Sequence, residues 1–289
     1  MKRIFKWDWP SSASNIQPAV VKFRNYLQDN GYRTSVIQGY VFRVRNYLRF
    51  AGTSRPTQDT FNEFRQVLHS KGLKRSTING YSISIKAYHK MYGEEVTYKF
   101  LKVNDQIPYF FDEEDVTKIF SVIRNYKHYA MLNVLFYGAL RVSELCALNI
   151  DDIDLDNLTV RVREGKGGVY SISLISPQCS DILKSYLEMR SPLDIDGKQP
   201  LFYTDYENRW QGIEVSRLFH RYKMKAGIVK PGGAHVFARH TVASLMVKNG
   251  CDLLTIKEIL RHKSIESSMR YLHLTDSTKR SKYDRYLRL

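Results

Sequence analysis

Apolar residues recur at helical spacing from Pro18 to Gly93, and no segment of that stretch alternates as a strand would. The pattern predicts four helices, with Asn30-Gly31 as a stop signal and Thr34, Pro56-Thr57 and Ser76 as start signals. Short amphipathic helices bury their apolar sides against one another. The stretch therefore predicts a small all-helical bundle over residues 18–93.

The rest of the chain predicts a second domain of a different kind. Residues 94–111 have no clear period and contain Pro108, so we expect a linker there. Beyond it, apolar patterns predict a helix over about 112–126, a buried helix over 130–137, and helices over 177–189, 215–226, 242–247 and 253–260. Two alternating segments, 158–162 and 169–174, flank Gly165-Lys166-Gly167-Gly168 and predict a β-hairpin.

The fold class that follows is mainly α with a small β-sheet. A chain of 289 residues is long enough for two cores. We expect the helical bundle to be followed by a mixed α/β domain over residues 112–275, with tails at 1–17 and 276–289.

The charge of the chain points to a polyanionic partner. Lys and Arg outnumber Asp and Glu by 45 to 29, a net charge of +16. Nucleic acid is the first candidate; simple solubility or attraction to an anionic membrane surface are the alternatives. The excess recurs from helix to helix in the predicted bundle, and we expect DNA contacts from Arg43, Arg45, Arg75 and Lys86.

Other features favour a cytoplasmic protein. No stretch approaches the roughly 20 apolar residues that span a bilayer, and the N-terminus lacks the apolar segment of a signal peptide. Cys146, Cys179 and Cys251 form no metal-binding pattern, which is typical of a reducing compartment.

Residues that carry chemistry gather between positions 235 and 273. His235, Arg239, His262 and Tyr271 lie near the ends of predicted helices, where side chains and backbone groups converge on small ligands. Each alone has a plain structural explanation, such as a helix cap or a surface cation. The combination, together with Arg141 and Lys166 upstream, suits a phosphate better than a metal.

These side chains could break and rejoin a phosphodiester. Two arginines can fork onto its oxygens, a tyrosine hydroxyl can attack phosphorus with a histidine as base, and a lysine can protonate the leaving oxygen. Arg141 and Glu144 are three residues apart on a predicted helix, so their side chains can meet. A purely structural salt bridge explains this pair as well as a role in the site does. No acidic cluster for Mg²⁺ and no phosphate-binding Gly-rich loop occurs, so we expect no metal, ATP or other cofactor.

The chain resembles the tyrosine recombinases of the phage-integrase/Xer class over roughly residues 18–275. The matching pieces are Ala-Leu-Arg141-Val-Ser-Glu-Leu, Gly-Lys166-Gly-Gly, Arg239-His-Thr, His262-Lys-Ser and Tyr271-Leu-His273. The resemblance implies a SAM-like helical core-binding domain and a catalytic domain. It implies Tyr271 as nucleophile, Arg141 and Arg239 on the phosphate and Lys166 as general acid.

The resemblance also implies roles around the site and a state of assembly. His235 and His262 would assist proton transfer and phosphate binding, and Glu144 and His273 would support the site. Four protomers would act on two double-stranded DNA molecules through a Holliday junction, starting from free monomers or dimers. Residues 276–289 would dock on a neighbouring protomer.

The sequence departs from the family pattern in three places, one of which is the hairpin, where the basic residues that often follow the lysine are missing after Lys166. His235 and Arg239 are four apart, where the family has three, and Val236 holds the usual histidine position. Since three and four residues share a helix face, we expect His235 to reach the site and His240 to point away. Arg261 replaces the usual glycine before His262, and with Lys263 we expect it to add positive charge beside the DNA phosphate.

The first functional hypothesis is site-specific recombination through a covalent 3′-phosphotyrosine. One alternative is a topoisomerase-like activity that relaxes DNA without exchanging strands. Another is a sequence-specific DNA-binding protein whose altered His235 region has impaired catalysis.

Overall fold

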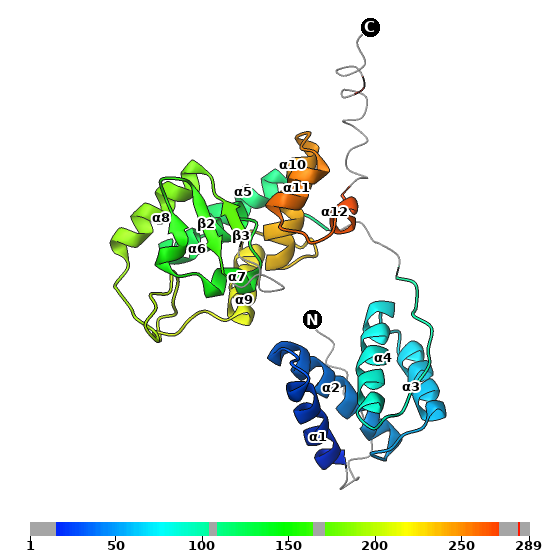
Figure 1. Cartoon of the computed structure of the whole chain (residues 1–289). Helices are drawn as coiled ribbons and strands as arrows, with labels where there is room; N and C mark the ends of the chain where they lie inside the picture. The colour runs from blue at the N-terminus through cyan, green and yellow to red at the C-terminus, as the bar shows by residue number, and fades with distance from the viewer. Residues whose placement is uncertain (1–15, 104–108, 164–170, 272–282, 284–289) are drawn as a thin grey trace. The chain divides into compact units, whose positions relative to one another are not determined.

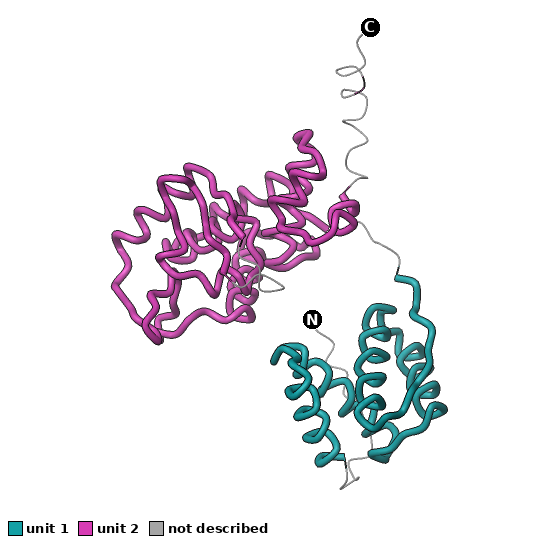
Figure 2. Tube along the Cα trace, viewed as in Figure 1, with its two compact units in different colours: residues 1–104 teal, residues 105–289 magenta. Residues whose placement is uncertain are grey.

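The structure is a computed structural model that describes residues 16–103, 109–163, 171–271 and 283. The chain divides into two compact units, residues 1–104 and residues 105–289 (Figure 2). The division lies inside the segment predicted as a linker. Each unit has its own buried core and is described by itself.

The first unit is a helical bundle. Its described helices are α1 (Ile16–Asp29), α2 (Thr34–Ala51), α3 (Gln58–Ser70) and α4 (Arg75–Lys90). α2 packs against α1, α3 and α4, as Figure 1 shows in blue and cyan. Large aromatic side chains fill the core, among them Phe23, Tyr47, Phe64 and Tyr88. The helical period of the sequence is the cause, since it places these residues on inward faces.

The helix starts of the bundle agree with the prediction at one site only. Thr57 caps α3, and its side chain accepts a hydrogen bond from the backbone N–H of Thr60 at 3.3 Å. The predicted caps at Thr34 and Ser76 are wrong, because the chain enters the helix earlier. The extended residues before α2 and α4 are Arg33 and Lys74, and neither makes a side-chain cap.

Part of the segment predicted as a linker packs on the bundle. Val96 is buried in the first core. The side chain of Gln58 donates to the carbonyl of Thr97 at 3.1 Å and accepts from its N–H at 2.9 Å. Asn79 makes the same pair of bonds with the backbone of Leu101. Residues up to about 101 are therefore tied to the first unit.

The second unit is mainly helical and contains the described strands. Its first elements are α5 (Glu113–Ser121), α6 (Tyr126–Tyr137), α7 (Val142–Ala147), the 3₁₀-helix η1 (Ile150–Asp152), β1 (Ile153–Asp154), β2 (Thr159–Val162) and β3 (Ser171–Leu174). The remaining elements are α8 (Pro177–Met189), α9 (Gly212–Lys225), the π-helix η2 (Val236–Thr241), α10 (Val242–Lys248), α11 (Leu253–Ile259) and α12 (Glu266–Met269). The fold class is as predicted from the sequence.

The described strands form one antiparallel sheet in the order β1-β2-β3, with Thr159 opposite Leu174. The two hairpin strands are confirmed. β1 was not predicted, because its two residues are too few to show an alternating pattern. The hairpin tip, which includes Lys166, lies outside the described residues. α8 matches its predicted span, because the side chain of Ser176 caps it and Pro177 opens it. The helix predicted over 112–126 ends at Ser121, and α6 begins at Tyr126 after the side-chain cap of Asn125.

The apolar helix α6 is central to the second unit. Its residues Ala130 to Leu135 are buried, and it packs against α7, α8 and η2 (Figure 1). The chain leaves α6 through Gly138 and Ala139 and enters α7 at Arg141. This turn brings α6 next to the segment that carries the predicted site. Within the described ranges, no helix has both the length and the apolar character needed to cross a bilayer.

Candidate active site

Arg141 lies at the start of α7 and is held by Glu144. Its backbone N–H donates to one carboxylate oxygen of Glu144 at 2.8 Å, and its Nη1 donates to the other at 2.5 Å. The Glu144 side chain is 3% exposed and that of Arg141 is 26% exposed. The predicted contact between the two side chains is confirmed, and it leaves part of the Arg141 guanidinium open to solvent.

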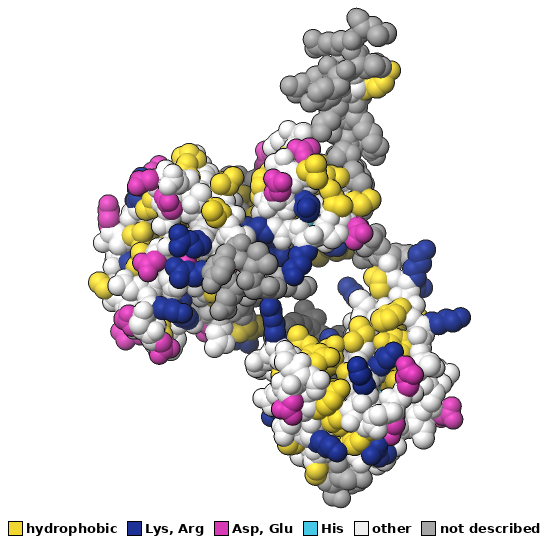
Figure 3. All heavy atoms as spheres, viewed as in Figure 1, with side chains coloured by type: hydrophobic (Ala, Val, Ile, Leu, Met, Phe, Trp, Pro, Cys, Tyr) yellow, Lys and Arg dark blue, Asp and Glu magenta, His cyan; other side chains and the backbone are white. Residues whose placement is uncertain are grey.

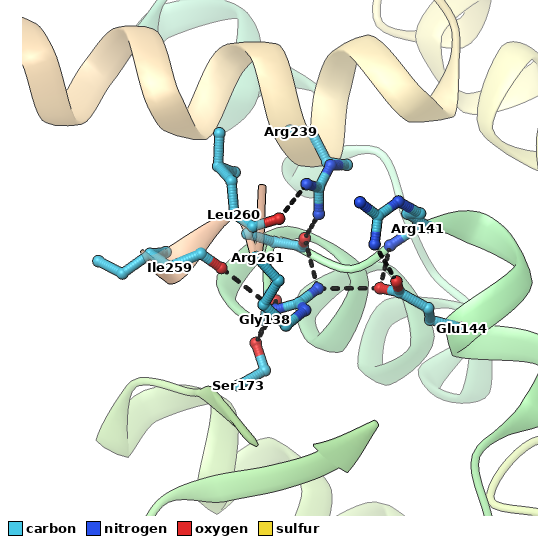
Figure 4. Close-up of polar contacts among 9 residues, drawn as sticks. Gly138, Arg141, Glu144, Ser173, Arg239, Ile259, Leu260 and Arg261 are labelled. Carbon is cyan, nitrogen blue, oxygen red and sulfur yellow. Dashed lines mark hydrogen bonds and ion pairs between the residues drawn. The ribbon is translucent and has the colours of Figure 1, made fainter. Parts of the chain in front are cut away.

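A second guanidinium shares the same carboxylate. Nη2 of Arg261 donates to Oε2 of Glu144 at 2.9 Å. Burial opposes ionisation of Glu144, but Arg261 and then Arg141 outweigh it and lower the pKa of the carboxyl group. Figure 4 shows both arginines converging on Glu144. One buried anion therefore balances two cations here.

Arg239 comes from the π-helix η2 and is 3% exposed. Its Nη1 donates to the carbonyl of Ala139 at 2.7 Å, and its Nη2 donates to the carbonyl of Leu260. Burial, followed by the charges of Arg141 and Arg261, lowers its pKa. The guanidinium groups of Arg141 and Arg239 lie close together in Figure 4. The turn after α6 thus brings the two arginines into one neighbourhood.

The π-helix changes which histidine faces the site. Hydrogen bonds of a π-helix join residues five apart, so residues at that spacing lie on one face. His235 precedes η2 and His240 lies within it, and their ring centroids are 5.2 Å apart. In an α-helix, five residues make about 1.4 turns and would place the two rings on different faces. The prediction that His240 points away is therefore wrong.

His240 contacts the hydroxyl group of Tyr271. Its Nδ1 lies 2.6 Å from the Tyr271 oxygen. Burial raises the pKa of Tyr271 to about 12, although Arg270 and Arg239 oppose it. Burial lowers the pKa of His240 to about 4, and the neighbouring His235 and Arg270 add to this effect. The imidazole is therefore neutral at pH 7 and the tyrosine is protonated, and the tautomer of His240 decides which of the two donates the hydrogen bond between them.

His262 and His235 complete the cluster. Nδ1 of His262 lies 2.8 Å from the hydroxyl oxygen of Ser268. Burial, with Arg239 and Arg141, lowers the pKa of His262 to about 4. Burial and the same arginines also lower the pKa of His235. The structure thus brings together Arg141, His235, Arg239, His262 and Tyr271, while Lys166 and His273 lie outside the described residues.

The predicted DNA contacts are spread over both units. In the first unit, Lys86 is exposed, Arg45 is partly buried, Arg43 lies against Gly80 with Nη1 3.4 Å from Ser84 Oγ, and Arg75 donates to the carbonyl of Lys102. In the second unit, Lys263 is exposed. The Arg261 side chain is 8% exposed and turned toward Glu144, so its charge is satisfied inside the unit.

Sequence reasoning missed His240 and the inward direction of Arg261. The four-residue interval from His235 to Arg239 was the available signal for His240, because one extra residue is what a π-turn accommodates. The sequence holds no comparable signal for Arg261, because its partners Ser173 and Glu144 come from distant elements.

The site offers cations for a phosphate and a neutral His–Tyr pair. Such a set can neutralise a phosphodiester and remove a proton from an attacking hydroxyl. Among the described residues, no group of three or more His, Cys, Asp or Glu side chains is placed to hold a metal ion.

Comparisons with known proteins extend over the same region. A sequence profile of the phage integrase family matches residues 109–278. Tyrosine recombinase XerA of Thermococcus kodakarensis is 31% identical over 263 residues, which cover 89% of this chain and 90% of that protein. Tyrosine recombinase XerC of Thermodesulfovibrio yellowstonii is 32% identical over 187 residues, only 60% of that relative's length.

Solved structures share the fold. A crystal structure of XerA recombinase aligns over 95% of this chain and 99% of its own, with 26% identity and a TM-score of 0.56. The XerH site-specific recombinase, solved bound to a palindromic difH substrate, has a TM-score of 0.71 at 19% identity and covers 95% of this chain and 85% of its own. At that identity the second match describes the fold alone.

Proposed function

The chain belongs to the phage integrase family of tyrosine recombinases, and from this premise we propose that it cuts and rejoins double-stranded DNA through Tyr271. The observation that carries the proposal is the contact of the Tyr271 hydroxyl with neutral His240, beside Arg239 and Arg141. A tyrosine next to fixed cations and a neutral base is suited to attack on phosphorus.

In the proposed reaction, the Tyr271 oxygen bonds to phosphorus while its proton passes to Nδ1 of His240. The bond from phosphorus to the 5′ oxygen breaks, and the leaving oxygen takes a proton from Lys166, as the resemblance implies. A 3′-phosphotyrosine conserves the bond energy, so neither ATP nor a metal ion is required. Attack by a 5′ hydroxyl reverses these steps and releases the tyrosine.

Duplex DNA is the proposed substrate. The net charge of +16 favours a polyanion. Lysine and arginine side chains lie on the visible faces of both units, and on the first unit they are interspersed with hydrophobic side chains (Figure 3). The XerH relative of the same fold was solved on its difH DNA. A substrate of this class also favours the cytoplasm as the place of action.

Strand exchange between two sites is the proposed outcome. Four protomers on two duplexes is the arrangement that the family resemblance implies, with residues 276–289 docking between protomers. Those residues lie outside the described part of the chain. In an assembly of four, two protomers would bind each crossover site, and each would supply one tyrosine for cleavage.

Covalent trapping tests the proposal. The protein first selects its site from a randomised duplex library by repeated gel shift. A duplex carrying that site and a nick beside the scissile phosphate is then incubated with wild type or Tyr271→Phe in EDTA without ATP. We expect a denaturant-resistant adduct with wild type alone, and equal gel shifts for both proteins.

The other outcomes identify the alternatives. If wild type binds the selected site but forms no adduct, the chain is a DNA-binding protein that does not cut. If it forms an adduct and relaxes supercoiled plasmid, yet never exchanges strands between two sites, it acts as a topoisomerase.

A further inference from the structure

Arg261 occupies a backbone position that favours glycine. Its φ is +53°, in the left-handed region, and it directly follows Leu260, the C-cap residue of α11. The N–H of Arg261 bonds to the carbonyl of Glu258, and the N–H of His262 bonds to the carbonyl of Lys257, both at 2.9 Å. This pair of bonds defines a Schellman end, in which the left-handed residue is usually glycine. Because this conformation is unfavourable for a residue other than glycine, we expect the Arg261 side chain to make contacts that stabilise the structure.

The guanidinium of Arg261 joins elements that are far apart in the sequence. Nη1 donates to Ser173 Oγ in β3 at 2.8 Å and to the carbonyl of Ile259 at 3.1 Å. Nη2 donates to Glu144 Oε2 at 2.9 Å and to the carbonyl of Ala139 at 3.2 Å. Figure 4 shows this side chain between the sheet and the turn after α6. It is a buried cross-link rather than a surface charge.

Two of these contacts lead to the arginines of the site. The Glu144 carboxylate that accepts from Arg261 also accepts from Arg141. The Ala139 carbonyl that accepts from Arg261 also accepts from Arg239 at 2.7 Å. Arg261 therefore shares one acceptor with each arginine and restricts where both guanidinium groups can lie.

We propose that Arg261 is a positioning residue that aligns Arg141 and Arg239 on one phosphate group. This rests on the proposed function of Tyr271 and replaces the expectation that Arg261 itself contacts DNA. Without the Arg261 side chain, the Glu144 carboxylate would be bonded only to Arg141 and could rotate together with it. The carbonyl of Ala139 would accept a hydrogen bond only from Arg239. The two guanidinium groups would then lose their common orientation, while the charge on each remained.

The test compares Arg261→Gly with Arg261→Lys. Glycine suits the backbone and deletes the cross-link, whereas lysine keeps the charge but not the planar fork. Arg190→Ala is the matched control, because Arg190 is a partly buried arginine of the same unit that bonds to the carbonyl of Pro200. Adduct formation is measured at saturating concentrations of the selected nicked duplex, beside the gel-shift Kd and the thermal unfolding midpoint.

We expect Arg261→Gly to lower the rate at saturation by about 10- to 100-fold through misplacement of the phosphate grip. Its Kd should stay within about threefold of wild type, because phosphate contacts elsewhere supply most of the affinity. Arg261→Lys should not restore the rate, and Arg190→Ala should retain it.

A methylphosphonate at the scissile position separates positioning from general damage. This neutral group needs no alignment of two cations, so the ratio of wild-type to Arg261→Gly rates should fall toward one. An unchanged ratio would mean that Arg261 only maintains the fold, and an undiminished Arg261→Gly rate on the normal phosphate would overturn the proposal outright. If wild type itself forms no adduct, the proposed function fails and this role fails with it.

Discussion

Nδ1 of His240 and the hydroxyl oxygen of Tyr271 lie 2.6 Å apart, and burial moves their pKa values in opposite directions. The histidine is kept neutral and the tyrosine is kept protonated. The contact depends on the π-helix η2, which turns His240 toward the face that carries His235. One local change in helix geometry thus gives the candidate nucleophile its base.

Replacement of His240 by Gln should change the pH profile of adduct formation. Wild type should react at a nearly constant rate from pH 6 to 9 and slow down as His240 is protonated near pH 4. The variant keeps a polar group but must rely on tyrosinate, so its rate should be about 100-fold lower at pH 7 and rise about tenfold per pH unit. Single-turnover trapping from about pH 3.5 to pH 9.5 measures both. A flat profile for the variant would remove His240 from proton transfer.

The same variant should alter the pH dependence of stability. The pKa of His240 is about 4 in the folded protein against an ordinary 6.5, so the unfolded chain binds more protons between these values. Stability is therefore complete above pH 6.5 and is lost as the pH falls toward 4, by about 1–3 kcal/mol from this group. Urea unfolding at pH 7.5, 6 and 5 should show a smaller acid loss in His240→Gln. Parallel curves for the two proteins would contradict the depressed pKa.

Glu144→Gln should destabilise the second unit far more than Glu114→Gln. The first change leaves Arg141 and Arg261 without their buried anion, which costs about 3–5 kcal/mol. Glu114 pairs with Lys118 on the surface of α5 and is 75% exposed, so its replacement should be within measurement error. Denaturant unfolding compares the two variants. Equal effects would show that the arginines do not depend on Glu144.

Lys86→Gln should weaken DNA binding in a salt-dependent way. Lys86 is exposed on α4, on the bundle that carries the predicted phosphate contacts. Loss of one phosphate contact should lower the slope of log Kd against log salt by about 0.9. Lys118→Gln removes the same charge from α5 and serves as the control. Identical slopes for the two variants would exclude Lys86 from the interface.

Thr57→Ala and Ser76→Ala distinguish a real helix cap from an apparent one. Thr57 accepts a hydrogen bond at the start of α3, so its loss should cost about 1 kcal/mol. Ser76 lies within the first turn of α4, which has Lys74 as its cap residue, and its replacement should be nearly neutral. Urea unfolding of the first unit's transition measures the difference, and a larger loss for Ser76→Ala would contradict the assigned helix start.

Local patterns were enough to predict much of the fold, as α8 illustrates. Ser176 and Pro177 are strong start signals, and both ends of that helix were predicted. The start of α2 was misplaced by one residue, because Thr34 is a good cap by type while the extended backbone belongs to Arg33. Propensity identifies candidates for a cap, but tertiary packing decides where the chain enters the helix.

Most residues of the candidate site were predicted from the sequence, but the contacts between them were not. The combination of residue types and the family resemblance indicated Arg141, Arg239 and Tyr271 as candidates, and in the structure the charges of Arg141 and Arg239 act on the same small cluster as Tyr271. The role of His240 could not be predicted, because α-helical periodicity was assumed where a π-turn occurs. The partners of Arg261 could not be predicted either, since they depend on how α11, β3 and α7 pack.

Tyr271 is 1% exposed, so the proposed nucleophile is closed off from solvent in the free protein. Tyr271 belongs to a buried cluster with Ala243, Val247 and Leu260, so its side chain can meet a phosphate only after that packing opens. Under the proposed function, the rate of DNA cleavage would be the product of a small open population and a fast chemical step. A ligand that binds the open form more tightly than the closed form would then decide when cleavage occurs. Latency would thus be a property of the apolar core, and it would protect DNA that the protein binds without recognising a site.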